Sequence, residues 1–539
     1  MVFFLIVISL YWLMNSSYRR QNWLLFVASY VFYAWWDIRF LFLIVVSTVV
    51  DYWTSLLMQN GRLSVRQKTR SGLFLVFSAF AFATVQWRQV SWQNINIASL
   101  LPDSLGGWWV MGAAVCLFLA MNMIELIPRR VRFARPERFF LFWCVFTNLA
   151  ILGVFKYFNF FTDSFVSLWS MLFNADPGQI TTRIILPVGI SFFTFQTMSH
   201  AIDVYRKDIP ATGSLLELGT YVAFFPQLVA GPIERGAHLL PQFQRPRKVT
   251  REQFREGTWL IFWGLYKKIV VADNVAKIVN GVFGPYDSLS LSGIPEDGLR
   301  CLIAIYAFAV QIYCDFSGYS DIARGTAKLL GFDIMLNFNL PYFAKNPPDF
   351  WRRWHISLST WLRDYLYIPL GGNRYGKWNT YRNLIITMLL GGLWHGAAWT
   401  FVLWGAFHGL LLAVWRLLSG KGSKTKPIAV RVFWSLVTFH LICFGWLLFR
   451  AQNIATITTF TQAIFTNLHA SEETFICIRQ LLFYSWFLIL FQVVQGWTKN
   501  LNIMSRVHWF VRLNVWVLIF VSLFRLARPG AQEFIYFAF

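Results

Sequence analysis

The sequence predicts an all-α, polytopic bundle of transmembrane helices. Of its 539 residues, 57% are hydrophobic and only 14% are charged, whereas a soluble domain carries about a quarter charged residues. Apolar runs recur from one end of the chain to the other. Aromatic residues make up 19%, which suits a membrane protein, because Trp and Tyr gather at the two bilayer interfaces. These observations predict one continuous membrane-embedded domain covering residues 1–539.

The apolar runs give the expected membrane segments, about 11–14 of them when each is matched to a bilayer. Crossing the bilayer takes about 20 helical residues, and several runs are shorter. Tilted, kinked or re-entrant pieces are therefore expected. The runs lie near residues 2–14, 22–36, 40–58, 73–86, 107–127, 139–161, 184–203, 260–283, 299–325, 381–416, 430–449, 478–495 and 508–526.

The charges in the connecting loops predict the orientation. Loops 15–21, 59–71 and 129–138 are basic, and so is the linker-like loop 417–429, whereas loop 284–298 carries three acids and no base. Basic loops stay on the cytoplasmic side. The N-terminus is therefore expected outside, and by the same counting the C-terminus is also expected outside.

Two stretches interrupt this alternation. Residues 215–235 are apolar but are flanked on both sides by cytoplasmic charge, and residues 342–380 mix Trp, Arg, Pro and Gly without a clean span. Irregular backbone survives at membrane depth only where protein buries it or where it lines a wet cavity. Both stretches are therefore expected to be interfacial or re-entrant, and to mark a site.

Composition also argues against other classes of protein. The net charge of +23 is spread over short loops between apolar runs, so membrane lipid is the expected partner and no nucleic acid is expected. The six cysteines are scattered and form no C-x-x-C pair, and no Cys/His cluster has zinc spacing. No metal site is expected. Nucleotide phosphate loops and G-x-S-x-G serine elbows are absent from the sequence.

The run from Gln311 to Asp321 places polar groups inside an apolar segment. Asp315 and Tyr319 share a helix face with Gln311, at i, i+4 and i+8. Asp321 has Arg324 three residues later as its expected partner. Ionisable groups inside a membrane are costly and mark functional candidates. A buried polar network that holds helices together is favoured here, and direct substrate contact stays open as the alternative.

The stretch 347–372 combines aromatic, basic and glycine residues around His355. Asp349 is expected to cap a helix that follows two prolines, and the arginines suit an anionic group such as a donor phosphate. The alternative is an amphipathic helix anchored at the headgroups. This alternative is favoured for the aromatic residues, whereas a functional role is favoured for His355. The candidates for substrate or donor contact here are Arg352, Arg353, Trp354 and Arg363.

His395 is the strongest candidate for a reactive group. It lies within a long apolar run and is hemmed by Gly391, Gly392 and Gly396, which let other backbone or a ligand approach closely. A helix that rises about 1.5 Å per residue from the basic start of this run places His395 well inside the membrane. A neutral imidazole there is an apt general base. A structural core histidine is the alternative.

Several ordered blocks resemble the membrane-bound O-acyltransferase family. They resemble in particular the bacterial branch that includes alginate O-acetyltransferase and the D-alanyl transferase of teichoic acids. The surrounding residues are more similar to the alginate-acetylating proteins. The matching blocks lie between about residue 150 and about residue 410; they are 186–196, 225–233, 313–321, 354–359, 363–372 and 392–396.

The resemblance implies a catalytic His395 and a second polar position at His355. It also implies a ring of helices around a central tunnel in a multi-pass protein of the cell inner membrane. The substrates would be a cytoplasmic acyl thioester, either acetyl-CoA or an acyl carrier, and an extracytoplasmic polysaccharide or a secreted SGNH-hydrolase-like partner. No bound cofactor is implied. Gln196 and Trp394, which lie within matching blocks, join the substrate-binding candidates.

Two other functions remain open. A lipid or protein O-acyltransferase of the same family would use a long acyl chain. A proton-coupled transporter would use Asp315, Asp321 and His395 as a relay, but it predicts inverted repeats with paired broken helices, and the sequence shows no such repeat. O-acyl transfer, with an acetyl group as the expected cargo, is therefore the favoured function.

Overall fold

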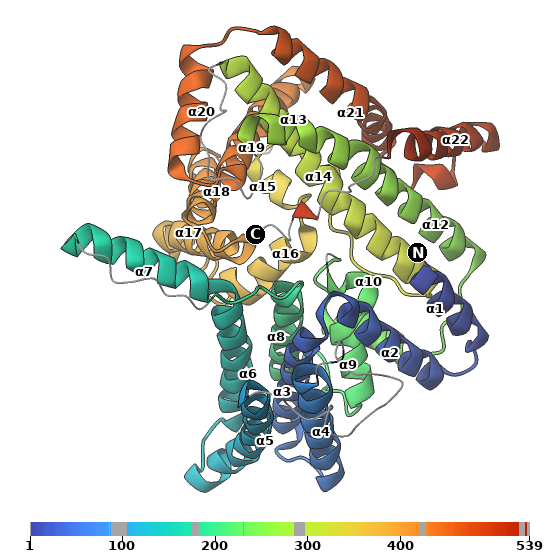
Figure 1. The fold of residues 1–539 in the computed structure, drawn as a ribbon, viewed down its shortest axis with the longest axis vertical. Helices are drawn as coiled ribbons and strands as arrows, with labels where there is room; N and C mark the ends of the chain where they lie inside the picture. Colours follow the sequence, from blue (N-terminus) through green and yellow to red (C-terminus); the bar gives the residue numbers. More distant parts are fainter. Residues whose placement is uncertain are drawn as a thin grey trace. The chain divides into compact units, whose positions relative to one another are not determined.

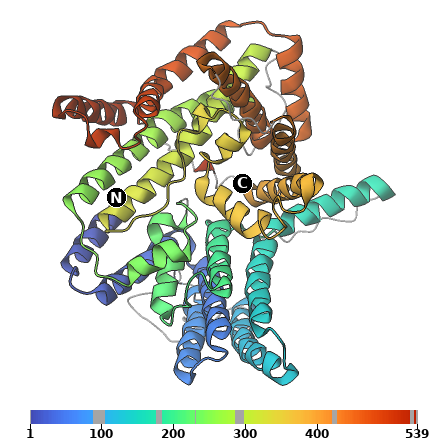
Figure 2. The ribbon, with the colours of Figure 1, turned by 180° about the vertical axis from the view of Figure 1, so that it is seen from behind.

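The computed structural model describes residues 2–85, 87, 105–174, 183–229, 231–284, 297–419, 427–527 and 534–535. Within these ranges all regular structure is helical (Figures 1 and 2), which confirms the predicted all-α class. Residues 285–296 of the predicted outer loop and 420–426 of the predicted basic loop lie outside the described residues.

The contacts of the chain group into two compact units, which are described separately. Unit 1 comprises residues 1–229, 233–249 and 330–334, and unit 2 comprises residues 230–232, 250–329 and 335–539. The helices of unit 1 are α1 (Val2–Leu13), α2 (Tyr18–Asp37), α3 (Leu41–Asn60), α4 (Val65–Ser78), α5 (Leu105–Val131), α6 (Pro136–Leu152), α7 (Phe158–Phe173), α8 (Ile190–Arg206), α9 (Leu215–Ala223), α10 (Phe225–Leu228) and α11 (Gly236–Phe243).

Unit 2 contains the longest helix, α14, and the hairpin-like pair α17 and α18. Its helices are α12 (Arg251–Leu265), α13 (Asp273–Phe283), α14 (Gly298–Leu329), α15 (Pro347–Trp351), α16 (Ile356–Leu362), α17 (Gly376–His395), α18 (Trp399–Leu418), α19 (Ile428–Arg450), α20 (Ile454–Thr466), α21 (Glu472–Thr498) and α22 (Trp509–Leu526).

Eight helical segments in the described part of the chain are long and apolar enough to cross a membrane. Two shorter apolar helices, α1 and α20, add to them. This confirms a polytopic membrane protein. The eight segments are Tyr18–Asn60, Gly106–Val131, Pro136–Phe173, Gly298–Leu329, Trp399–Leu418, Ile428–Arg450, Glu472–Thr498 and Trp509–Leu526.

The apolar run 381–416 is divided between two helices, α17 and α18, rather than forming one. The break lies at residues 396–398. The two helices pack so closely that a Cβ on Gly392 would collide with the carbonyl oxygen of Phe401, and one on Gly405 with that of Met388. Only glycine permits such an approach. The result is a tight pair of helices that fixes the end of α17, where His395 lies.

Both stretches predicted to be interfacial or re-entrant are divided into short helices and turns, and their position in the membrane stays a prediction. Residues 215–235 form the short helices α9 and α10 and then leave helical structure. Residues 342–380 form α15, α16, a π-helical turn at Arg363–Tyr367 and a series of turns before α17 begins. The predicted cap at Asp349 is wrong by three residues. Asn346 is the N-cap of α15, because its side chain accepts the N–H of Asp349 at 2.8 Å.

Candidate functional site

His395 is the last residue of α17 and is buried. Aromatic rings enclose its imidazole. The ring centroids of Trp394 and Trp404 each lie 5.0 Å from that of His395, and Phe449 of α19 lies at 5.4 Å. All three meet the imidazole at steep interplanar angles. The position at a helix end, followed at once by Gly396, lets the imidazole stand clear of its own helix.

His355 lies between α15 and α16 and is fully buried. Its backbone is left-handed, with φ 41° and ψ 54°. This conformation costs a residue with a Cβ roughly 1–2 kcal/mol, and it persists only where the surroundings impose it. The ring of Phe316 in α14 packs edge-on against the imidazole at 4.6 Å.

Asn337 holds the backbone around His355 in place. Its carbonyl oxygen accepts the N–H of Ile356 at 2.9 Å. Its side-chain oxygen accepts the hydroxyl of Ser357 at 2.7 Å, and its amide donates to Ser320 of α14 at 3.1 Å. On the other side of His355, the N–H of Asn339 donates to the carbonyl of Arg353 at 2.9 Å. These bonds fix the left-handed turn and therefore the direction of the imidazole.

The structure brings the two predicted histidines together. The ring centroids of His355 and His395 are 6.3 Å apart. Trp394 lies beside both, 5.8 Å from His355 and 5.0 Å from His395. Two imidazoles at this separation can act on one small substrate group, one as a base and the other as a hydrogen-bond donor.

A cavity of about 480 Å³ lies in the same unit. Its apolar part includes Trp351, Leu384 and Met388, and its basic part is formed by Arg352, Arg363 and Arg416. Neither His355 nor His395 lines this cavity. Two packed rings separate it from His395, because the ring of Trp351 lies 5.6 Å from that of Trp404, which in turn contacts His395. An apolar slot with three guanidinium groups suits a molecule that has an extended chain and a phosphate-bearing end.

Three arginines were predicted to contact the donor, and the structure separates them. Arg352 and Arg363 line the cavity, and Arg363 also pairs with Asp364 at 2.7 Å. Arg353 does not line it. Its guanidinium bonds Asp349 at 3.0 Å and the carbonyl oxygen of Asn339 at 3.3 Å. Arg353 thus supports the turn that carries His355. Sequence reasoning missed Arg416, which lies at the end of α18.

Trp354 is almost fully buried, so the predicted alternative of a headgroup anchor does not describe it. Its indole lies 5.0 Å from the ring of Phe338 and 4.7 Å from Trp446 of α19, measured between centroids. It is stacked on Phe350 at an interplanar angle of 16°. Trp354 therefore packs α15, the 335–340 segment and α19 together directly beneath His355.

Asp315 and Asp321 lie on α14 and are paired with two lysines that the sequence analysis did not select. Lys267 reaches Asp321 at 2.6 Å and donates to Ser317 at 2.9 Å. Lys268 reaches Asp315 at 2.8 Å and Asp273 at 2.8 Å. The predicted partner Arg324 is farther from Asp321, at 3.7 Å. These pairs support the reading of α14 as part of a polar network that joins helices. The rule that marks ionisable groups inside apolar runs would have found both lysines.

Residues 534–535 lie against this network, and no sequence signal predicted their position. The N–H of Ile535 donates to Asp315 at 2.7 Å. The ring of Phe534 lies 4.2 Å from Tyr319 and 6.0 Å from Phe316, which itself packs on His355. Tyr319 therefore contacts this segment, and both of the described residues of the segment are buried.

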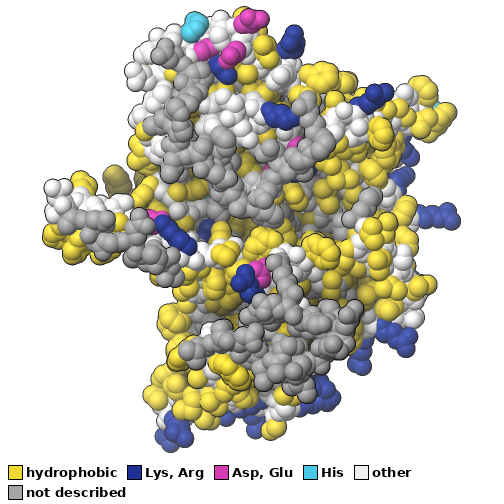
Figure 3. Space-filling view, viewed as in Figure 1, with side chains coloured by type: hydrophobic (Ala, Val, Ile, Leu, Met, Phe, Trp, Pro, Cys, Tyr) yellow, Lys and Arg dark blue, Asp and Glu magenta, His cyan; other side chains and the backbone are white. Residues whose placement is uncertain are grey.

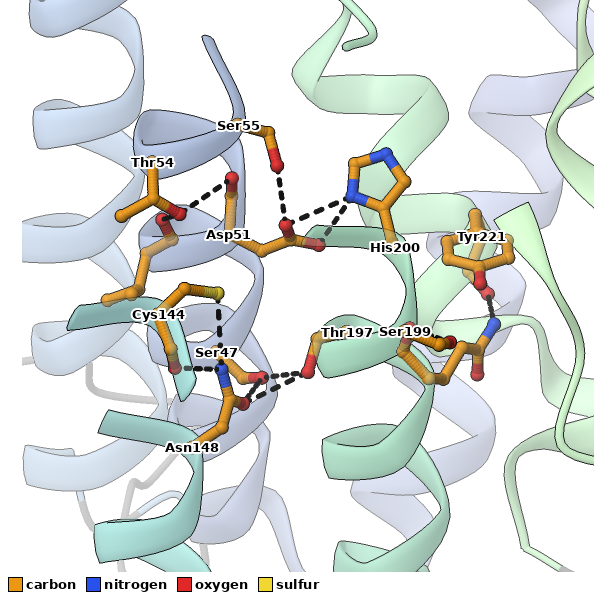
Figure 4. Close-up of polar contacts among 12 residues, drawn as sticks. Ser47, Asp51, Thr54, Ser55, Cys144, Asn148, Thr197, Ser199, His200 and Tyr221 are labelled. Atoms are coloured by element: carbon orange, nitrogen blue, oxygen red, sulfur yellow. Dashed lines mark hydrogen bonds and ion pairs between the residues drawn. The ribbon is translucent and has the colours of Figure 1, made fainter. Parts of the chain in front are cut away.

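Unit 1 contains Gln196 and a third buried histidine, His200, both on α8. Gln196 donates to the carbonyl of Tyr221 at 2.8 Å and so ties α8 to α9. The Nδ1 atom of His200 lies 2.9 and 3.0 Å from the two carboxylate oxygens of Asp51 on α3. Figure 4 shows this pair beside a second polar group formed by Ser47, Asn148 and Thr197. These contacts join α3, α6 and α8.

The fold and the histidine pair define a polytopic membrane protein with a candidate reaction site inside its helices. The chain belongs to the MBOAT, or membrane-bound O-acyltransferase, family, whose model matches residues 107–448. This confirms the family suggested by the sequence blocks. The protein is a multi-pass, inner-membrane O-acyltransferase.

Three relatives illustrate the range of the similarity. The "Probable alginate O-acetylase AlgI" of Azotobacter vinelandii is 39% identical over 465 residues, which is 86% of this chain and 76% of the relative. The "Peptidoglycan O-acetyltransferase" of Helicobacter pylori is 37% identical, over 62% of this chain and 66% of its own. The "Teichoic acid D-alanyltransferase" of Bacillus subtilis is 26% identical, over 63% and 85%.

Proposed function

We propose that this protein transfers an acetyl group from a cytoplasmic thioester to a hydroxyl group on the other side of the membrane. The acceptor is an extracytoplasmic polysaccharide or a periplasmic relay protein. The observation that carries the proposal is the placement of His395 and His355 with ring centroids 6.3 Å apart, separated from an arginine-lined cavity by the rings of Trp351 and Trp404. The relatives named for acetylation of alginate and peptidoglycan support acetyl as the cargo.

The chemistry needs one base and a stabilised oxyanion. A thioester is already activated, so the site mainly has to position the hydroxyl and remove its proton. His395 takes that proton as the hydroxyl oxygen attacks the thioester carbonyl. The carbon–sulfur bond then breaks, and the imidazolium returns the proton to the departing thiolate. The products are an ester and a free thiol, with no net proton uptake.

His355 is the proposed oxyanion partner. Its left-handed backbone, held by Asn337, fixes the direction of its ring. A donor that is already oriented costs no reorganisation when charge develops on the carbonyl oxygen, and such a donor contributes about 10²–10³ in rate. Trp394 and Trp404 exclude water around the pair, which strengthens these interactions.

Arg352, Arg363 and Arg416 are the proposed contacts to the donor. They line the cavity on the Trp351 side of His395. A donor such as acetyl-CoA or an acyl carrier brings phosphate, for which guanidinium groups are suited. The acyl end would then extend along Trp351 and Met388 toward His395.

The test compares two buried histidines of unit 2 in the purified, reconstituted protein. His395→Ala should reduce thiol release and acceptor esterification by about 10²–10⁴, the range for loss of a general base, while its thermal unfolding stays near that of the wild type. The matched control is His408→Ala. His408 is also buried, and its ring lies 4.7 Å from Trp404.

The control should keep activity within about tenfold, because His408 has no proposed contact with the reacting groups. Near wild-type transfer by His395→Ala would show that His395 is not the general base. A large loss in His408→Ala with an active His395→Ala would move the base to α18.

A further inference from the structure

A dense group of arginines covers one end of unit 1. The exposed arginines come from the α3–α4 connection with the start of α4, from the α5–α6 connection, and from the end of α8. We call them the arginine face. They are Arg62, Arg66, Arg70, Arg129, Arg130, Arg132, Arg135, Arg138 and Arg206.

Contacts between these loops show that the arginine face is one surface. Arg129 donates to the carbonyl of Gly61 at 2.8 Å, which joins the end of α5 to the end of α3. Arg138 at the start of α6 donates to the hydroxyl of Tyr205 on α8 at 3.3 Å. Figure 3 shows Lys and Arg side chains gathered along the lower edge of the view, where Figure 1 draws the ends of α4 and α5.

A buried carboxylate fixes the geometry of this surface. Glu125 of α5 is only 2% exposed. It pairs with Lys68 of α4 at 2.8 Å and with Arg129 at 3.0 Å. An ion pair with a buried partner is screened less by solvent than an exposed one. The neighbouring exposed arginines are therefore presented from a pinned pair of helix ends, not from a free loop.

The position of the arginine face at the ends of membrane spans determines which part of the bilayer it contacts. It joins the ends of the spans Tyr18–Asn60 and Gly106–Val131 to the start of Pro136–Phe173. The connections 61–64 and 132–135 hold four residues each and cannot reach far beyond the membrane surface. The arginines are therefore held at the level of the lipid headgroups. Exposed Val131 and Phe133 stand among them, a mixture of cations and apolar groups that suits the interface.

The chemistry of the exposed side chains determines which class of lipid headgroup the arginine face binds. Arginines outnumber lysines on this surface, where the exposed Lys207 and the half-buried Lys68 lie beside the nine members, and a guanidinium group binds phosphate oxygens bidentately. We propose that the arginine face binds the headgroup phosphates of anionic phospholipids in the leaflet where α3 and α5 end. Clusters of four to eight basic residues directly beside a membrane span bind anionic lipids through about 1 kcal/mol per residue. This inference does not depend on acyl transfer.

The test measures lipid binding by the purified full-length protein in detergent. Short-chain phosphatidylglycerol and, separately, phosphatidylcholine are titrated while the melting temperature is recorded. Phosphatidylglycerol should raise the melting temperature of the wild type more than phosphatidylcholine does. In the variant Arg62→Gln/Arg66→Gln/Arg130→Gln/Arg135→Gln, the same rise should need at least about tenfold more phosphatidylglycerol. Its melting temperature without lipid should stay near that of the wild type.

A control removes the same number of charges elsewhere. Arg245 and Lys248 are exposed between α11 and α12, and Arg251 and Arg255 are exposed at the start of α12. Their change to Gln should leave the phosphatidylglycerol response close to wild type. Equal responses of the arginine-face variant and the wild type would overturn the proposal. So would an equal stabilisation by inorganic phosphate at the same concentrations, which would indicate a site for soluble phosphate instead of lipid.

Discussion

His200 in unit 1 and His395 in unit 2 are both buried histidines in a membrane protein, yet their neighbours differ in kind. His200 faces a carboxylate, with Nδ1 2.9 and 3.0 Å from the two oxygens of Asp51, and Ser55 donates to the same carboxylate at 2.8 Å (Figure 4). His395 is enclosed by the rings of Trp394, Trp404 and Phe449.

Under the proposed function, this difference is the one between a structural and a reactive environment. A carboxylate at hydrogen-bonding distance fixes the tautomer and the orientation of an imidazole and uses one of its nitrogens. Aromatic walls restrict the orientation of the ring and keep water out, which is what a general base in mid-membrane needs. Burial alone therefore does not mark a catalytic histidine. The carboxylate beside His200 indicates a structural role. His395 differs from His408, which also lies among aromatic rings, by its position next to the second imidazole of His355.

The largest expected effect that tests this comparison is on stability. His200→Ala leaves the buried Asp51 carboxylate with Ser55 but without its imidazole, and breaking such a pair costs about 3–5 kcal/mol. The melting temperature of the purified protein should fall strongly, while transfer per folded molecule is retained. Asp51→Leu/His200→Leu, which removes both partners, should be less destabilised than His200→Ala. A His200→Ala variant that is stable but inactive would show that His200 does not differ from His395 in the way proposed here.

The next effect concerns the donor cavity of unit 2. Arg363→Gln should raise the KM for the thioester donor by about tenfold, because one hydrogen bond to a charged group is worth about 1.5–3 kcal/mol, with little change in kcat. Arg353→Gln is the matched control. Arg353 supports the His355 turn and does not line the cavity, so its loss should lower kcat or stability instead. Steady-state kinetics with varied donor separates the two.

A smaller effect isolates the backbone at His355. Its φ of 41° favours glycine, so His355→Gly should be more stable than His355→Ala by about 1 kcal/mol. Both variants should lose the same transfer activity, because both lack the imidazole. Chemical denaturation and the transfer assay measure the two quantities on the same preparations. A His355→Ala variant as stable as His355→Gly would argue that this backbone relaxes once the ring is gone.

The smallest effect comes from the second histidine of unit 1, His238, which is half-exposed. The hydrogen bond to the buried Glu234, at 2.9 Å, raises the pKa of His238, against the lowering effect of its partial burial. A raised folded-state pKa adds stability that is complete below the unfolded value of about 6.5. That stability is lost as pH rises through the folded-state pKa.

His238→Ala should therefore lower the melting temperature more at pH 5.5 than at pH 8.5, by the equivalent of less than about 1 kcal/mol because solvent screens the pair. Melting curves of both proteins at the two pH values measure the difference. If His238→Ala lowers the melting temperature equally at both pH values, the pair of His238 and Glu234 adds nothing to stability.

Much of the fold was predictable because membrane helices are selected by a local property. Apolar length alone located most segments, including α5, α14 and α19. Apolar length did not locate α20. It also did not locate α7, which continues α6 after a π-helical break at Gly153–Tyr157. It also merged α17 with α18, because the three residues between them, 396–398, are as small and apolar as a helix interior would allow.

The sequence by itself determined the class of protein and singled out His355 and His395 as the candidate site residues. A charged or imidazole group inside an apolar run is costly enough to stand out without any knowledge of its neighbours. The family blocks around His355 and His395 added the expected chemistry. Hydropathy and loop charge also sufficed for a polytopic inner-membrane protein.

Only the tertiary structure decided which groups meet. It placed His355 6.3 Å from His395 across 40 residues of chain, assigned Lys267 and Lys268 to the carboxylates of α14, and brought Phe534 against Tyr319. It also turned Arg353 away from the cavity that Arg363 lines. Such pairings depend on packing between distant segments, and no local pattern in the sequence records the distance between them.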